Sequence, residues 1–356
     1  MNRTYSTLIA WARMMLIAIA LVFVSASQSF AKTIRFAVIG DYGSTAQSSS
    51  NGQDEKQVAD MAKSWKPSFI ITLGDNNYEC GEASNIVENI GKYYCDFIYN
   101  AGAPAGQVCT GRAADDKTNY FFPTLGNHDW FTPNAQPYLN YFTQLPGNRR
   151  YYDFVQGPVH FFALDSESKE TCSSAADEEE GKPNKCKLPC TFEPDGGDKY
   201  SKQAQWLKDR LEASNSSWNL VFFHRPPYSC KAKTTAMWMR WPFVEWGANA
   251  VLSGHRHVYE RIVRKKYPSF PYFINGVGGT ELSKCTKKDE KENLPPTKFD
   301  AVSIDGRHGA MLVEASDDKI TFQFYVVGAN GGKVKDTCKL KKTKHGQSLS
   351  CTQVND

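Results

Sequence analysis

Residues 33–43 read TIRFAVIGDYG, an almost continuous apolar run that ends just before Asp41. A run of this length and composition is typical of a strand that is buried on both faces. Residues 53–65 follow with apolar side chains at helical spacing, and a second apolar run over residues 69–73 leads to Asp75. The succession of strand, helix and strand predicts one unit of an α/β protein.

The same alternation returns in the second half of the chain. It predicts helices near residues 206–211 and 238–246, and strands over residues 220–223 and 250–252. The tail over residues 309–327 has the pattern of antiparallel hairpin strands instead. We therefore expect an α/β fold whose sheets have largely parallel centres and are mixed overall.

The first 31 residues have the pattern of an export signal. Basic Arg3 and Arg13 precede an apolar run over residues 14–26, and small residues end the segment at Ala31. The alternative, an uncleaved membrane anchor, is disfavoured because this run is shorter than the roughly 20 residues that span a bilayer. We expect a removable signal peptide over residues 1–31, no stable membrane insertion after its cleavage, and a protein that is secreted or held in the lumen of a lysosome or vacuole.

Composition limits the remaining possibilities. Residues 32–356 are expected to form a single domain, since 41% of the chain is hydrophobic and no linker divides it. The formal charge of +4 is small for 356 residues, and the basic runs carry no interleaved aromatic side chains. These features argue against nucleic acid as a partner, and we expect a monomer that binds a small molecule.

Ten cysteines in an exported chain predict disulfide bonds. Their pairing cannot be read from the sequence. Two segments break the α/β alternation, near residues 80–118 and 166–200, and we interpret both as surface insertions tied down by disulfides. Asn215-Ser216-Ser217 is an acceptor sequence for N-glycosylation, which makes a glycoprotein possible.

Each predicted strand ends in side chains that can bind a metal ion. In open α/β sheets ligands gather at the carboxyl ends of the strands, so these side chains are expected to lie together. Any one of them alone would more often be a turn residue, a helix cap or a packed side chain. Five such blocks in order indicate a metal site. The blocks are Gly40-Asp41-Tyr42-Gly43, Gly74-Asp75-Asn76-Asn77-Tyr78, Gly126-Asn127-His128-Asp129, Val221-Phe222-Phe223-His224 and Gly254-His255-Arg256-His257.

In this order the blocks resemble the metallophosphoesterase signature, and Tyr78, three residues after Asp75, resembles its purple acid phosphatase branch. The resemblance implies an αββα sandwich of two mixed sheets, with Fe(III) and a divalent iron, zinc or manganese ion at the strand ends. It also implies three sets of ligands: Asp41, Tyr78 and His257 for Fe(III), Asn127, His224 and His255 for the divalent ion, and Asp75 as the bridge.

The residue types agree with this assignment. Carboxylate and phenolate are hard donors that suit a trivalent ion, whereas imidazole and an amide oxygen suit the divalent metals. The resemblance further gives His128 a catalytic role in binding the phosphate or protonating the leaving oxygen, which favours acidic pH. The family's additional histidine after the fourth block is missing from residues 229–241. We expect Lys231 or Lys233 to supply positive charge there.

The expected activity is that of a secreted acid phosphatase that hydrolyses phosphate monoesters by attack of a metal-activated water. Two alternatives remain open. One is a phosphodiesterase or nucleotide pyrophosphatase of the same fold with two like divalent ions. The other is a catalytically silent secreted binding protein. The missing histidine favours this alternative, whereas the complete set of ligands argues against it.

Overall fold

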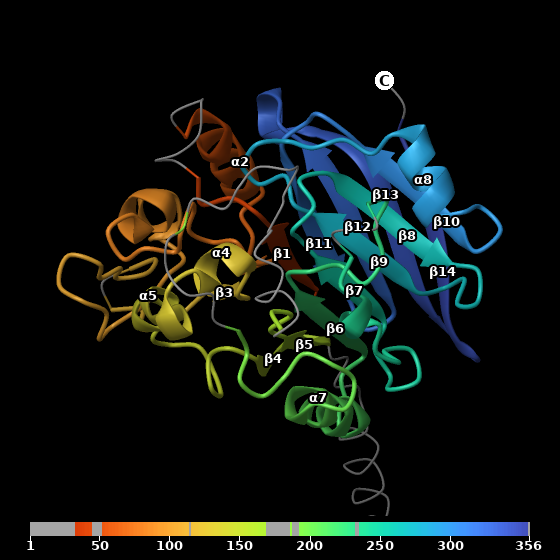
Figure 1. Cartoon of the computed structure of the whole chain (residues 1–356), viewed down its shortest axis with the longest axis horizontal. Helices are drawn as coiled ribbons and strands as arrows, with labels where there is room; N and C mark the ends of the chain where they lie inside the picture. The colour runs from red at the N-terminus through yellow and green to blue at the C-terminus, as the bar shows by residue number, and fades with distance from the viewer. Residues whose placement is uncertain are drawn as a thin grey trace, which may run out of the picture. The chain divides into compact units, whose positions relative to one another are not determined.

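In the part of the chain that the structure describes, two mixed β-sheets of seven strands each form the centre of the fold (Figure 1). The computed structural model describes residues 33–44, 52–113, 115–168, 186, 192–231 and 235–354. The predicted signal peptide over residues 1–31 lies outside this range, as do Cys172, Cys190 and Lys233.

The first sheet contains the opening strand of the described chain near its middle. Its strands lie in the order β14-β13-β12-β11-β1-β2-β3, in which β1, β2 and β3 are parallel and the others antiparallel. The bounds are β1 Ile34–Ile39, β2 Phe69–Thr72, β3 Phe121–Pro123, β11 Gly309–Ala315, β12 Lys319–Val326, β13 Lys333–Thr343 and β14 Gly346–Gln353.

The second sheet is made from one continuous stretch of the sequence. Its order is β10-β8-β9-β7-β6-β5-β4, with β5, β6, β7 and β9 parallel. The bounds are β4 Tyr152–Gln156, β5 Val159–Ala163, β6 Trp218–Phe223, β7 Ala250–Ser253, β8 Tyr259–Arg264, β9 Pro271–Asn275 and β10 Phe299–Ile304.

The core lies on both faces of the second sheet, because side chains alternate along each strand. In β5, Phe161 packs between the sheets, where its ring centroid lies 5.1 Å from that of Phe36 and 5.4 Å from that of Phe69. Its neighbour Phe162 points the other way, into an outer cluster that also contains Leu207 of α7. Continuous apolar runs therefore mark strands that are covered on both sides.

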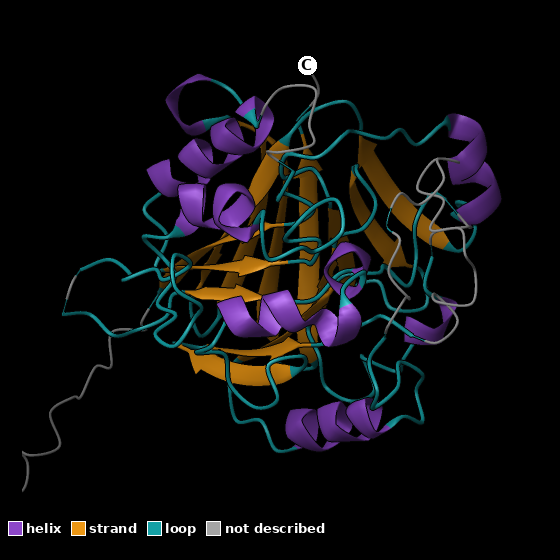
Figure 2. Cartoon of the chain, turned by 60° about the vertical axis from the view of Figure 1, so that its left-hand side comes forward, coloured by secondary structure: helices purple, strands orange, loops and turns teal. Residues whose placement is uncertain are grey.

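Helices cover the outer faces of the sheets (Figure 2). Helix α2 buries Val58, Met61 and Ala62 in the core cluster of the first sheet, whereas α7 covers the second. The layers thus run helix, sheet, sheet, helix, and the predicted αββα sandwich is confirmed. Among the described residues the helices are α2 Gln53–Ser64, α3 Lys92–Tyr94, α4 Asn127–Trp130, α5 Gln136–Tyr141, α7 Lys202–Glu212 and α8 Lys287–Asn293, with 3-10 or π segments at η1 Val87–Gly91, η2 Pro133–Ala135, η4 Met237–Met239 and η5 Ala329–Gly331.

The helix predicted over residues 238–246 is wrong. The chain forms only the 3-10 turn η4 there, followed by hydrogen-bonded turns up to Gly247. Pro242 explains the difference, because proline has no amide hydrogen to donate and disfavours a helical conformation in the residue before it.

Four disulfide bonds are present in the described residues. They join Cys80 to Cys186, Cys95 to Cys109, Cys230 to Cys285 and Cys338 to Cys351. The first of them links the segment after Tyr78 to the insertion near residues 166–200. None of the helices that the structure describes is long and apolar enough to cross a membrane.

Candidate metal centre

The side chains of the five sequence blocks meet where strands of both sheets end. Seven of them are the predicted metal ligands, and each is at most 9% exposed. Parallel strands bring their carboxyl ends to one edge, which is why residues far apart in the sequence converge there. Asp41 follows β1, Asp75 and Tyr78 follow β2, Asn127 and His128 open α4 after β3, His224 follows β6, and His255 and His257 follow β7.

One group of donor atoms surrounds the phenol of Tyr78. Its Oη lies 3.4 Å from Asp41 Oδ1, 3.0 Å from Asp75 Oδ2 and 3.3 Å from His257 Nε2. His257 Nε2 in turn lies 3.5 Å from Asp41 Oδ1. Two carboxylates, a phenol and an imidazole thus point their polar atoms at one another.

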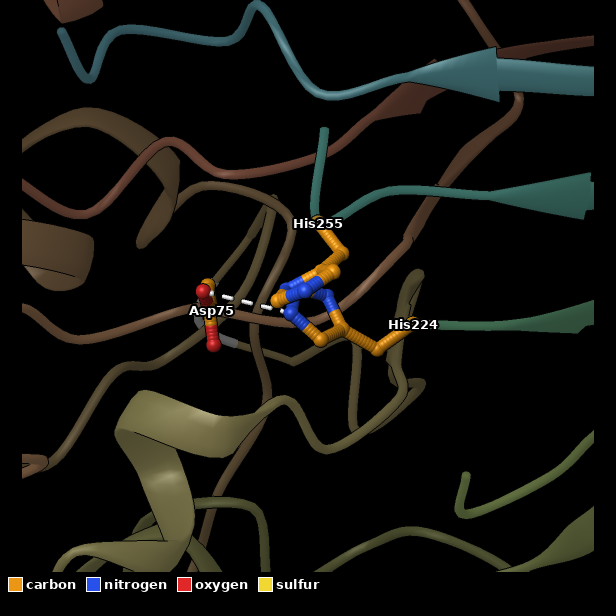
Figure 3. Close-up of side chains that lie close together, drawn as sticks. All are labelled: Asp75, His224 and His255. Carbon is orange, nitrogen blue, oxygen red and sulfur yellow. Dashed lines mark ion pairs between the residues drawn. The ribbon is translucent and has the colours of Figure 1, made fainter. Parts of the chain in front are cut away.

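A second group surrounds the ring of His224. Its Nε2 lies 3.2 Å from Asp75 Oδ2 and 2.9 Å from Asn127 Oδ1. Figure 3 shows the rings of His224 and His255 beside the carboxylate of Asp75, and one donor atom from each of these three lies within 4.8 Å of the other two. Asp75 Oδ2 is therefore common to both groups.

The spacing within both groups fits metal ions. Nitrogen and oxygen ligands bound at about 2.1 Å from an ion lie roughly 3.0–3.4 Å from one another. The distances around Tyr78 and His224 fall in or near this range. The donors are oxygen and imidazole nitrogen atoms, which are common ligands of transition-metal ions in proteins.

The backbone holds three of these residues in an uncommon conformation. Asp41, Asp75 and His255 have φ values of 55°, 50° and 68°. This left-handed region is unfavourable for residues other than glycine and persists where the surrounding structure enforces it, often at functional sites. Here it turns each side chain sharply from the end of its strand into the centre.

Glycines next to the donors leave them room. A Cβ added at Gly126 would lie 2.2 Å from Asp75 Oδ1, and one at Gly254 would lie 2.4 Å from Asp41 Oδ2. These contacts are too short for any side chain. The glycines that precede Asn127 and His255 in the sequence blocks are thus required by close packing of the site.

Hydrogen bonds from the backbone orient the donors. His224 Nδ1 lies 2.8 Å from the carbonyl oxygen of Leu73 and donates its hydrogen there, which turns Nε2 toward Asp75. The amide of His255 donates to Asp41, and the amide of His128 donates to Asp75 Oδ1 over 2.9 Å. Partners of this kind fix the tautomer and direction of metal-binding side chains.

The charges of the cluster favour a bound cation. Burial disfavours the charged form of His224, but the carboxylates of Asp75 and Asp41 outweigh it and raise the pKa of this histidine to about 10. Burial, with Arg225 and His224 nearby, instead lowers the pKa of His255 well below its usual value. The carboxylates thus attract positive charge to Nε2 of His224, where a bound metal ion could replace the proton, and His255 is already neutral, the form in which imidazole binds metals.

His128 lies beside the two groups. Its ring is tilted by 47° against that of Tyr78, with centroids 4.2 Å apart, and its Nδ1 contacts the carbonyl oxygen of Glu79. The other nitrogen, Nε2, lies 3.9 Å from Asp75 Oδ2. This arrangement leaves Nε2 directed toward the region between the donors.

A further set of potential ligands is formed by Cys230, Glu260 and Cys285. Both sulfur atoms belong to the disulfide between these cysteines, so they are unavailable to a metal. Glu260 instead accepts hydrogen bonds from the Ser229 hydroxyl and the Cys230 amide.

Comparison with known protein families identifies the family of this chain. The calcineurin-like phosphoesterase family matches residues 34–259, more than half of the chain. The chain belongs to this family. Members of the calcineurin-like phosphoesterase family bind metal ions, and the donor groups around Asp75 provide a candidate site for them.

Individual relatives agree with this membership. An acid phosphatase of Aspergillus ficuum is 26% identical, with 78% of this chain and 50% of that protein covered. The chain thus spans about half the length of this curated relative.

Two solved structures are also similar to this chain. GAP50, described as the anchor in the inner membrane complex of Plasmodium, has a TM-score of 0.54 and 17% identity, covering 88% of this chain and 90% of GAP50. PhoD has a TM-score of 0.51 and 13% identity, with 91% of this chain and 72% of PhoD covered. At such identities the likeness extends to the fold alone.

Two parts of the site were not foreseen from the sequence. Asp129 receives hydrogen bonds from the Gly126 amide and from Asn76, and it thereby joins the second and third blocks beneath the donors. Arg225 lies against His255, with its Nη1 2.9 Å from Nε2 of that ring. Asp129 belongs to one of the five sequence blocks, whereas nothing in the sequence indicates which residues the side chain of Arg225 contacts.

Of the two lysines expected to supply charge, Lys233 lies outside the described residues. Lys231 forms an ion pair of 2.7 Å with Asp289 at the start of α8. Its ammonium group is thus directed to a carboxylate of another element.

Proposed function

We propose that the chain is a secreted acid phosphatase that hydrolyses phosphate monoesters at a dinuclear Fe(III) and divalent metal centre. The observation that carries this proposal is the pair of donor groups that share Asp75 Oδ2. The group around Tyr78 contains the hard donors expected for Fe(III), and the group around His224 contains the imidazole and amide donors expected for iron, zinc or manganese(II).

Each candidate ligand has a specific place in this proposal. Asp41, Tyr78 and His257 would hold the ferric ion, Asn127, His224 and His255 the divalent ion, and Asp75 both. When bound, the ions supply the positive charge that neutralises a phosphate ester and the acidity that activates a water for attack on phosphorus.

His128 would deliver the proton that hydrolysis requires. The backbone carbonyl oxygen of Glu79 accepts from Nδ1 of its ring, so a protonated His128 presents Nε2–H toward the centre and can donate to the phosphate or to the leaving oxygen. Since only the charged ring has a proton at both nitrogens, this role supports activity at acidic pH.

The disulfide bonds support export. Four such bonds in the described residues fit an oxidising compartment, where structural disulfides persist. Asn215 is exposed just after α7, where a glycan would meet solvent.

The Tyr78→Phe variant tests the ferric site. Wild-type protein is expected to contain iron, to show a visible absorption band from the bound phenolate, and to hydrolyse p-nitrophenyl phosphate at acidic pH. The variant lacks the phenolate oxygen and is expected to lose the band. Visible spectra, metal analysis and rates from acidic to neutral pH measure these properties.

A matched control is Tyr152→Phe. Tyr152 is also buried, but its hydroxyl donates to the carbonyl oxygen of Pro123, away from the donor groups, so the colour is expected to remain. A colourless wild-type protein that hydrolyses only diesters would contradict the ferric assignment and favour a phosphodiesterase with two like ions.

The Gly126→Ala variant tests the packing around Asp75. The added methyl group would collide with Asp75 and displace its carboxylate from both donor groups. Misplacement by about 1 Å can reduce rates by about 100-fold, and we expect a loss of that order in kcat/KM together with reduced metal content. In Gly328→Ala the new Cβ meets nothing nearer than 3.8 Å, so that variant should behave as wild type.

A further inference from the structure

Arg225 places a fixed positive charge at the edge of the candidate metal centre. It follows His224 at the end of β6 and is only 6% exposed. Its Nη1 lies 2.9 Å from Nε2 of His255. One end of the guanidinium thus lies within hydrogen-bond distance of a proposed ligand of the divalent ion.

The other end of the guanidinium is anchored by Glu167. Arg225 Nε lies 2.9 Å from both carboxylate oxygens of Glu167, which is 2% exposed. The amide of Arg225 donates to the Ser166 hydroxyl over 2.8 Å, and the amide of Glu167 donates to Asp165 Oδ1 over 3.0 Å. The loop after β5 therefore fixes the direction of this side chain.

The anchoring distinguishes Arg225 from Lys231. The ammonium group of Lys231 is paired with Asp289, and about a third of its side chain is exposed. A partly exposed, paired lysine contributes little directed charge to a distant site. Arg225 is buried, its Nε is held by Glu167, and it lies next to His255. It is therefore better placed than Lys231 to supply the positive charge that the missing histidine would provide.

We propose that Arg225 binds the phosphoryl group of the substrate and selects phosphate monoesters over diesters. This inference rests on the proposed function, because it assigns the substrate class of the same centre. Glu167 acts as a positioning residue, which holds the guanidinium in direction without touching the substrate.

The selectivity follows from the number of terminal oxygens. A monoester has three terminal oxygens and, since its second pKa is about 6, a charge between −1 and −2 at acidic pH, whereas a diester has two terminal oxygens and a charge of −1. If two terminal oxygens of the phosphoryl group face the metal ions, a monoester has a third terminal oxygen left for Arg225. A diester has only the oxygen that carries its second ester group in that position. A guanidinium forms strong, directional, charge-assisted hydrogen bonds to phosphate, which the second ester group would weaken and obstruct.

The test compares Arg225→Met, Arg225→Lys and Glu167→Gln with wild type in the metal-loaded protein. We measure kcat/KM for p-nitrophenyl phosphate and bis(p-nitrophenyl) phosphate, the affinity for inorganic phosphate by calorimetry, and the metal content. For Arg225→Met we expect about a 100-fold loss on the monoester and in phosphate affinity, and less than about a 5-fold loss on the diester.

The two other variants separate charge from direction. Arg225→Lys keeps the charge but lacks the planar fork, so its monoester loss should be intermediate. Glu167→Gln keeps Arg225 but weakens its anchor, and it should raise KM more than it lowers kcat. Lys231→Met is the matched control and should leave the monoester to diester ratio unchanged.

Equal losses on both esters in Arg225→Met would overturn the proposed selectivity, and so would an unchanged phosphate affinity. Loss of metal in Arg225→Met and Arg225→Lys would instead assign the side chain to holding His255, and would also overturn it. If wild type binds phosphate through Arg225 but hydrolyses neither ester, the proposed function fails while the phosphate-binding role of Arg225 stands.

Discussion

Replacing Asp75 by alanine is expected to reduce kcat/KM for phosphate monoesters by at least about 10³-fold. The carboxylate lies 3.0 Å from the phenol of Tyr78 and 3.2 Å from Nε2 of His224, so it is the one side chain common to both donor groups. Its loss should release metal from both positions, whereas loss of any other candidate ligand affects one group directly.

The measurement combines steady-state rates with metal analysis of the purified variant. Asp75→Asn is a useful companion because it keeps the shape and one oxygen donor but removes the charge. Asp60→Ala is the control, since Asp60 is an exposed residue of α2 that pairs with Lys56 and belongs to neither donor group. Full metal content and normal turnover in Asp75→Ala would refute the shared-ligand assignment.

Replacing Phe161 by alanine is expected to lower the free energy of unfolding by about 3–5 kcal/mol. Phe161 is fully buried between the sheets, where its ring contacts those of Phe36 and Phe69 from the first sheet and stacks on Phe154 of β4. Truncation removes these contacts and leaves a cavity that the facing strands cannot fill.

Guanidinium denaturation of the oxidised protein measures this effect as a lower midpoint. Val155→Ala provides the control, because Val155 is 54% exposed on the same pair of strands and should change stability by no more than about 0.5 kcal/mol. A Phe161→Ala protein as stable as the control would mean that the two sheets do not depend on this aromatic contact.

The sequence was most informative where local pattern and burial coincide. Apolar runs predicted β1, β2 and β7 to within one residue at either end, because strands covered on both faces leave no alternation to misread. The position of Asp41, Asp75 and His255 followed from the same strands. Their left-handed backbone did not, since a lone aspartate after a strand is equally compatible with an ordinary turn.

Contacts between distant segments were beyond what the sequence could predict. Arg225 and Glu167 are 58 residues apart, and neither has a spacing that indicates its partner. The pairing of Cys80 with Cys186 joins two insertions of irregular composition. Conversely, aromatic residues at helical spacing over 238–246 gave a false prediction, because the backbone restriction imposed by Pro242 outweighs side-chain periodicity.

The strand order of the first sheet determines how the protein can acquire its structure during synthesis. β1 precedes the entire second sheet in the sequence, whereas its antiparallel neighbour β11 follows it. At about 5–20 residues per second, β11 emerges from the ribosome roughly 15–60 s after β1. Throughout that interval the nascent chain presents an apolar strand with one unpaired edge, and such an edge is prone to pair with other chains until β11 covers it.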